Sequence, residues 1–137
     1  MKRQILIWVI VLAAILFPGA APQEVQLPDT DAGRIAAEYI RIINSGNDQD
    51  MQKFIAVNMS EASKKRRSEE ERLQVFHELK GQTGWAHVHS VLKSEPGLLS
   101  ILLETERTGW VSFDFVFETD PPFKLDSIQI EQAEPPK

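Results

Sequence analysis

The chain has 137 residues, a formal net charge of −5 and no cysteine. This length accommodates one domain with a real hydrophobic core. The lack of cysteine excludes disulfides and a lipid anchor attached through a cysteine. The acidic balance argues against nucleic acid as a partner, because binding a polyanion normally needs a basic footprint.

Residues 1–21 have the pattern of a signal peptide. Lys2 and Arg3 precede an uninterrupted apolar run, residues 5–17, which is short for a membrane span, and small residues follow at 18–21. We therefore expect export to the periplasm or the extracellular space. Pro22 makes the cleavage site unusual, so an uncleaved N-terminal anchor, with membrane attachment only in that case, remains an alternative.

The remainder is predicted to consist of a linker at 22–29, a domain at 30–131 and a disordered tail at 132–137. Three amphipathic helices are expected in the first half of the domain. The first begins at 29–31 and ends at 45–47, the second spans 48–57, and the third begins at a capping box, 68–71, and is stopped by Gly81. Their apolar faces carry Ile35, Tyr39, Ile42 and Ile43, then Met51, Phe54 and Ile55, then Leu73, Phe76 and Leu79.

The basic run at 64–67 lies between the second and third helices. An acidic run, 69–71, follows almost at once. Removal of Lys2 and Arg3 with the leader leaves 13 basic against 20 acidic side chains, which further weakens a nucleic-acid function. We interpret residues 64–67 as a solvated loop that pairs with the following helix.

Residues 85–130 are predicted to form four consecutive strands, which span 85–92, 98–107, 110–118 and 123–130. Turn signals separate them at 95–97, 108–109 and 120–122. In the third strand, Val111, Phe113, Phe115 and Phe117 alternate with polar residues. The expected architecture is α+β, with three N-terminal helices on one face of a four-stranded antiparallel sheet.

The last strand contains a conflict of register. Leu125 has odd parity, whereas Ile128 and Ile130 have even parity. All three reach one face only if an extra residue is inserted near 126–127, which predicts a β-bulge. The alternative is a regular strand in which Leu125 packs at the sheet margin.

Element order and lengths resemble the NTF2-like (cystatin-like cone) superfamily over about residues 31–134. The supporting stretches are 39–47, 68–72, 109–113 and 121–125. More narrowly, the chain resembles the small module found ahead of serine-hydrolase or tail-protease domains in exported bacterial proteins. The resemblance implies a strongly curved sheet around a pocket, and a homodimer formed through the sheet. It does not carry hydrolase activity to this chain, because these stretches are scaffold motifs and none is catalytic.

The phenylalanine face of the third strand must meet the helices, which leaves a predicted pocket with almost no titratable groups. We expect its lining to be Tyr39, Phe54, Phe76, Phe113 and Phe115. Acid–base catalysis needs positioned groups with tuned pKa values. The sequence therefore favours a non-enzymatic module without a cofactor, which binds an apolar small molecule or an envelope protein.

On the first strand, Ala86, Val88 and Leu92 are expected to face the helices. The outer face then carries Trp85, His87, His89, Trp110 and Asp114, with Val91 and Val116 beside them. Apolar patches and exposed tryptophans are typical of interfaces, so this face is the predicted homodimer interface. The alternative is a monomer with scattered exposed aromatic residues.

The rival hypothesis is a small NTF2-like isomerase or hydrolase. His87 or His89 would act as the base and Asp114 would orient it, provided that all three point into the pocket. The same three residues could form a two-His-one-carboxylate metal site, although a single His-x-His is weak support. A third possibility is a membrane-tethered structural adaptor, which requires the leader to remain attached.

Overall fold

The computed structural model describes residues 25–137, so the predicted leader and the first part of the linker lie outside the described residues. Within that part of the chain, four helices precede four strands. The helices are α1 (Asp31–Ser45), α2 (Asp48–Asn58), α3 (Glu61–Arg66) and α4 (Glu69–Thr83). The strands are β1 (Ala86–Glu95), β2 (Leu98–Thr105), β3 (Gly109–Phe117) and β4 (Leu125–Gln132). The predicted α+β class and four strands are confirmed, and the predicted number of helices is wrong.

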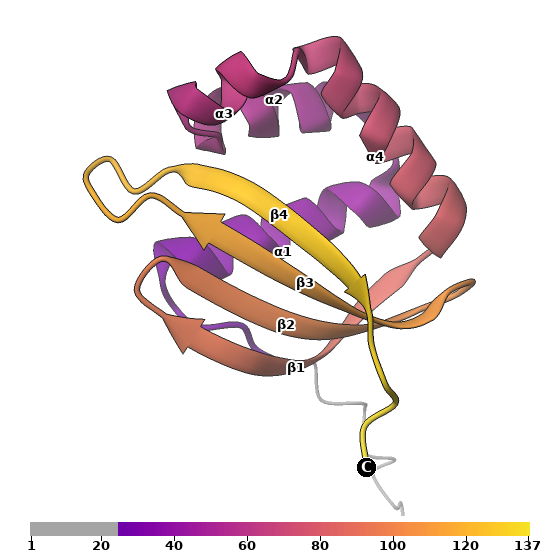
Figure 1. Cartoon of the computed structure of the whole chain (residues 1–137). Helices are drawn as coiled ribbons and strands as arrows, with labels where there is room; N and C mark the ends of the chain where they lie inside the picture. The colour runs from indigo at the N-terminus through magenta and orange to yellow at the C-terminus, as the bar shows by residue number, and fades with distance from the viewer. Residues whose placement is uncertain (1–24) are drawn as a thin grey trace, which may run out of the picture.

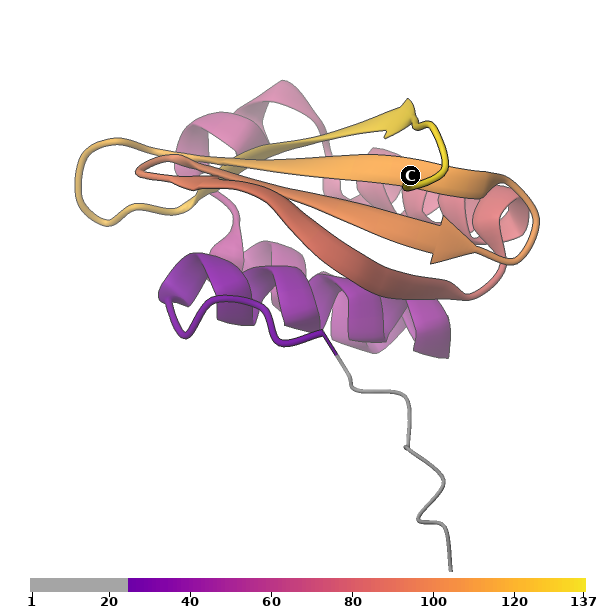
Figure 2. The same ribbon diagram turned by 90° about the horizontal axis from the view of Figure 1, so that it is seen from below.

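The sheet has the order β1-β2-β3-β4, and each neighbouring pair is antiparallel. Figure 1 shows α1 behind the twisted sheet, while α2, α3 and α4 arch above the β4 edge. The view from below places α1 along one face of the strands (Figure 2). In the described part of the chain no helix covers the opposite, outer face.

The core lies between α1 and the inner face of the sheet. Phe113 and Phe115 of β3 are fully buried, as are Ile42 and Ile43 of α1. Each such side chain stabilises the fold by roughly 1.5–3 kcal/mol relative to an exposed position. The strict alternation in β3 therefore fixes which face of the sheet meets the helices.

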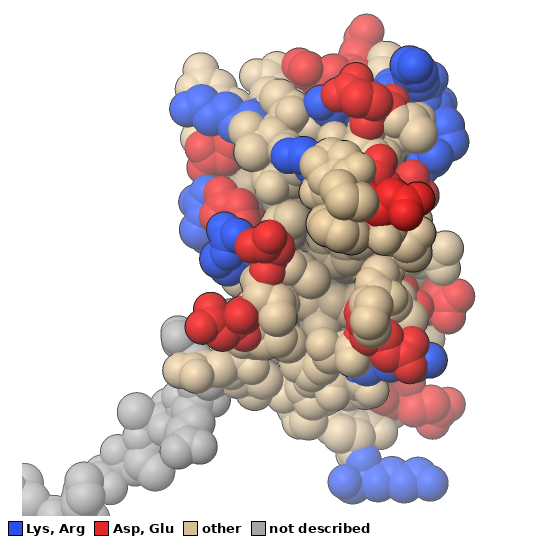
Figure 3. Space-filling model, turned by 90° about the vertical axis from the view of Figure 1, so that its left-hand side faces the viewer, with Lys and Arg blue, Asp and Glu red and all other residues tan. Residues whose placement is uncertain are grey.

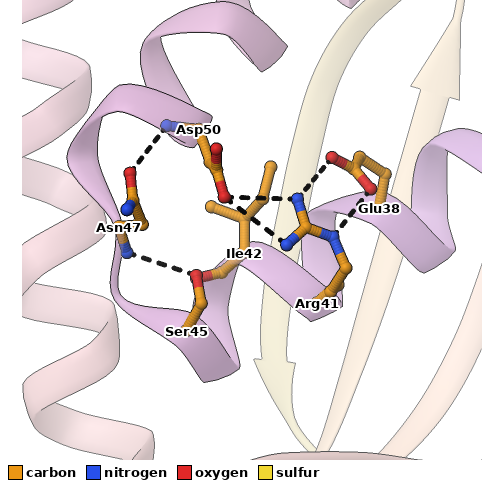
Figure 4. Close-up of polar contacts among 6 residues, drawn as sticks. All are labelled: Glu38, Arg41, Ile42, Ser45, Asn47 and Asp50. Carbon is orange, nitrogen blue, oxygen red and sulfur yellow. Dashed lines mark hydrogen bonds and ion pairs between the residues drawn. The ribbon is translucent and has the colours of Figure 1, made fainter.

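The corner between α1 and α2 is fastened by polar side chains, as Figure 4 shows. The Arg41 guanidinium donates to Glu38 at 2.7 and 3.0 Å and to Asp50 at 3.3 and 3.4 Å. The hydrogen bond from Arg41 lowers the pKa of Glu38. Gly46, with φ of 67°, ends α1 in the left-handed region that glycine adopts without strain. The end of the first helix, which was predicted at residues 45–47, is therefore confirmed.

Helix boundaries after α2 differ from the prediction. Residues 64–66 of the predicted loop belong to the short helix α3, which the Ser60 hydroxyl caps by accepting from the Ser63 amide at 3.0 Å. The predicted capping box is present, with Ser68 and Glu71 bonded reciprocally. However, α4 continues through Gly81 to Thr83, since a single glycine costs only about 1 kcal/mol in a helix.

The predicted bulge in β4 is confirmed. Pairing shifts between Val116 and Phe117, which oppose Ser127 and Leu125, so Asp126 is the extra residue. As a result Leu125 is fully buried on the same face as Ile128. The alternative of a regular strand with a marginal Leu125 is wrong.

Strand β1 contains two further shifts of register, at 88–90 and at 91–93. After the first shift Val91 opposes Ile101 and packs against the core, whereas Leu92 is 54% exposed. The predicted orientations of Val91 and Leu92 are therefore reversed. The shift comes after His87, so it does not turn that residue inward.

Candidate functional site

A cavity of about 340 Å³ lies between α1, α2, α4 and the start of β4, next to the α3–α4 corner. Just over half of its lining residues are apolar: Tyr39, Met51, Phe54, Ile55, Met59, Val75, Phe76 and Ile128. Polar side chains line the remainder: Ser63, Arg66, Arg67, Arg72, Asp126 and Ser127. The exposed positions among these, Arg66, Arg67 and Val75, mark the side that opens to solvent.

Three of the five predicted pocket residues line this cavity, namely Tyr39, Phe54 and Phe76. Phe113 and Phe115 are fully buried and do not line it. Their rings lie 6.3 and 5.8 Å from the Tyr39 ring, so they support its position from behind. The two phenylalanines of β3 thus belong to the core wall, and Tyr39 stands between them and the cavity.

Tyr39 presents the only phenol of the chain to this cavity. Its ring packs against Phe54 with centroids 5.4 Å apart. Burial raises the pKa of Tyr39 to about 12, and the nearby Arg72 guanidinium opposes that rise. The hydroxyl therefore stays protonated at neutral pH and can donate one hydrogen bond.

Arg72 is the functional candidate that sequence reasoning missed. Its Nη2 donates to the Ser63 hydroxyl at 2.9 Å and also to the Ser63 carbonyl. Its Nε is buried and has no hydrogen-bond partner within residues 25–137. Burial lowers the pKa of Arg72, with the charges of Arg67 and Arg66 acting in the same direction. The available signal was spacing, since Arg72 precedes Phe76 by four residues and so shares its helix face.

The basic run 64–67 is not the solvated loop that was predicted. Lys64 pairs with Glu61 within α3, and Arg66 pairs with Asp126 of β4 at 2.9 Å instead of with α4. Arg66 and Arg67 line the cavity. In Figure 3, Lys and Arg side chains stand among Asp and Glu in the upper part of the view. The run therefore contributes side chains to a site as well as to a mixed surface.

The structure places on the outer face of the sheet the five residues that were predicted to lie there, namely Trp85, His87, His89, Trp110 and Asp114. His89 packs edge-on against Trp110 with ring centroids 5.1 Å apart, and Trp85 lies 4.7 Å from His87. Asp114 accepts a hydrogen bond from Ser100 and lies on the same outer face of the sheet. These aromatic pairs form two small clusters on a face that no described helix covers.

The same geometry separates Asp114 from the histidines. His87 opposes Glu104, which opposes Trp110, and the His89 ring packs against Trp110, whereas Asp114 lies four residues further along β3. Four residues of strand span roughly 13 Å. None of the three lines the cavity, and no group of three or more metal-binding side chains is found among residues 25–137. The arrangement that the rival enzyme and metal hypotheses require is not formed.

Ser90 and Lys93 have the Ser-x-x-Lys spacing of some serine hydrolases, which sequence reasoning overlooked. A nucleophile of that kind needs the lysine within hydrogen-bond reach. Lys93 instead lies 3.6 Å from Glu95, and the Ser90 hydroxyl lies 3.2 Å from His89 Nδ1. Both residues are on strand β1, and neither lines the cavity.

A wider hollow of about 1090 Å³ lies between residues 25–29, α1 and β1, and His87 borders it. Both of its arginines are already paired, Arg34 with Asp31 and Arg41 with Glu38 and Asp50, and its carboxylate Asp29 is exposed to solvent. A hollow whose arginines are already paired offers less to an anionic or polar ligand than a cavity beside an arginine that pairs with no carboxylate. The cavity beside Arg72 is therefore the stronger candidate.

Comparison of the chain with models of known protein families and with curated proteins found no match. The resemblance to the NTF2-like superfamily therefore stays a prediction. Among the described residues, no helix has the length and apolar character needed to cross a membrane.

Proposed function

We propose that this domain is a non-enzymatic binding module that holds a small, mainly apolar molecule in the cavity between α2, α4 and β4. The observation that carries the proposal is the cavity itself, with its apolar lining from four separate elements. Ligand pockets are concave, mostly apolar and supplied with a few oriented polar groups. Asp126 is the one carboxylate of the lining, and Arg66 already engages it in an ion pair.

The size of the cavity limits the ligand. At the roughly 30 Å³ that a water molecule occupies in the liquid, 340 Å³ corresponds to about ten non-hydrogen atoms. The aromatic rings of Phe54 and Phe76 form part of its walls. A short alkyl chain or a single ring system suits this volume.

An NTF2-like cone, export and a homodimer complete the proposal. Support for the cone comes from the helix-then-meander order and from the twisted sheet. Support for a dimer comes from the outer face, where Trp85 is 40% exposed beside His87 and His89 packs against Trp110. An envelope protein is an alternative occupant of that face, by analogy with the related exported modules.

Native mass spectrometry of protein purified without denaturation from the cells that produce it tests the proposal. We expect a retained adduct of small mass that organic solvent extracts. Val75→Trp, at the exposed edge of the cavity, is expected to reduce the adduct by obstructing entry. Val57→Trp is the matched control, because Val57 is exposed on α2 and does not line the cavity. Protein that carries no adduct and binds no member of a panel of short-chain and single-ring compounds would contradict the proposal.

A further inference from the structure

The Arg72 side chain is held in place but incompletely satisfied. Its Nη2 atom is fixed by the hydroxyl and carbonyl of Ser63, while the buried Nε has no partner in the described chain. No carboxylate of residues 25–137 lies within 4.0 Å of this guanidinium. A buried, charged donor without an acceptor is costly, so such a group usually has a reason to be there.

The cavity lining carries a surplus of positive charge. Three guanidinium groups, those of Arg66, Arg67 and Arg72, line it together with a single carboxylate, that of Asp126. Asp126 is engaged by Arg66. This local surplus contrasts with the net negative charge of the whole chain. Focused positive potential at the mouth of a low-dielectric cavity attracts anions.

Tyr39 adds a second unmatched donor on the cavity wall. Its ring is fixed by Phe54 and Phe115, and its hydroxyl makes no hydrogen bond within residues 25–137. A carboxylate accepts several hydrogen bonds through its two oxygens. The Nη1 of Arg72 has only the sulfur of Met59, a lining residue, as a partner at 4.0 Å. This Nη1 and the phenol O–H of Tyr39 are donors that one carboxylate can use together.

Building on the proposed function, we infer that the ligand is an amphipathic anion, with a carboxylate bound by Arg72 and Tyr39 and an apolar body among Phe54, Phe76 and Ile128. A neutral apolar molecule leaves the Arg72 Nη1 with a thioether sulfur as its only partner, and a cationic one meets three guanidinium groups. A medium-chain carboxylate fits both the charge and the volume.

The test compares three probes of equal chain length, namely octanoate, octanol and octylammonium, by calorimetry on the purified chain. We expect octanoate to bind at least about tenfold more tightly than octanol, the effect of a hydrogen bond to a charged group. We expect octylammonium to bind more weakly than either. In a proton–nitrogen spectrum the Arg72 Nε–H resonance should shift as octanoate is added, which needs no variant.

Arg72→Gln should remove the preference for octanoate over octanol, and Tyr39→Phe should reduce it. Arg34→Gln is the matched control, since Arg34 is exposed on α1 and lies outside the cavity lining. Octanol binding as tightly as octanoate, or octanoate binding without movement of the Arg72 resonance, would overturn this inference while leaving the proposed function intact. Failure of all three probes to bind would overturn both.

Discussion

Asn44 of α1 pairs with Ala86, the first residue of β1, through both groups of its side-chain amide. Asn44 Nδ2 donates to the Ala86 carbonyl at 2.9 Å, and the Ala86 amide donates to Asn44 Oδ1 at 2.8 Å. Because β1 is an edge strand, these backbone groups have no neighbouring strand to bond. The side-chain amide of Asn44 therefore makes the two hydrogen bonds that a neighbouring strand would otherwise make, and it connects α1 to β1.

Asn44→Ala removes both of these bonds and leaves two backbone groups of β1 without their partner. We expect a loss of roughly 1–3 kcal/mol in the free energy of unfolding, measured by urea denaturation. Gln49→Ala, at an exposed position on α2, is the control and should change little. Equal stability of the two variants would show that the Asn44 pairing contributes nothing.

The ion pair between Glu38 and Arg41 predicts a pH dependence of stability. Because Arg41 lowers the pKa of Glu38 below its ordinary value of 4.5, the pair stabilises the fold above that pH. The contribution is lost as the pH falls through the lower, folded-state pKa. Both side chains are about half exposed, so the effect is small and is screened by salt.

Urea midpoints of the wild type and Glu38→Gln should therefore differ at pH 6 and converge towards pH 3. Glu134→Gln, in the exposed C-terminal segment, serves as the control for removing one negative charge. A gap between wild type and Glu38→Gln that persists unchanged to pH 3 would exclude this ion pair as its cause.

Phe123 has φ of 54° in the connection between β3 and β4, although its side chain is 56% exposed. A residue with a Cβ atom is disfavoured in this left-handed region, whereas glycine is not. We expect Phe123→Gly to be about 1 kcal/mol more stable than Phe123→Ala, by thermal or urea unfolding. Both variants lose the same aromatic ring, so their difference isolates the backbone. A more stable alanine variant would contradict the conformation described.

The proposed dimer predicts that sedimentation velocity detects a species of twice the chain mass. Trp110→Ser should shift this species to the monomer, because the His89–Trp110 pair would lie within the interface. Val57→Ser, on the helical layer, should leave it unchanged. A wild type that sediments as a monomer at every concentration would refute the dimer.

The sheet was predictable because its information is local. In β3 the period of two is uninterrupted, and in β4 the parity conflict between Leu125 and Ile128 revealed the extra residue in advance. In β1 the pattern was ambiguous, because Val91 and Leu92 are both apolar and either can be buried. Which of the two is buried depends on how β1 pairs with β2, and the sequence of β1 alone does not determine that pairing.

The helical layer and the site were harder to predict. Helix α3 has six residues, and apolar residues do not recur in it at helical spacing. Its capping residue, Ser60, is therefore the only sequence signal for this helix. The cavity forms where α1, α2, α4 and β4 converge, and no single segment encodes that convergence. Arg72 was overlooked because an arginine on a surface helix is ordinarily solvated, and its burial depends on α3 folding over it.

The bonds from Arg72 to Ser63 have a thermodynamic consequence. They fasten α3 to α4 with the same side chain that we assign to the ligand. If a ligand binds Arg72 more tightly when this corner is closed, then the closed corner is stabilised by an equal coupling free energy. Ligand binding in the cavity would then slow the exchange of the amide hydrogens of α3. The exchange rate of this short helix would therefore report whether the cavity is occupied.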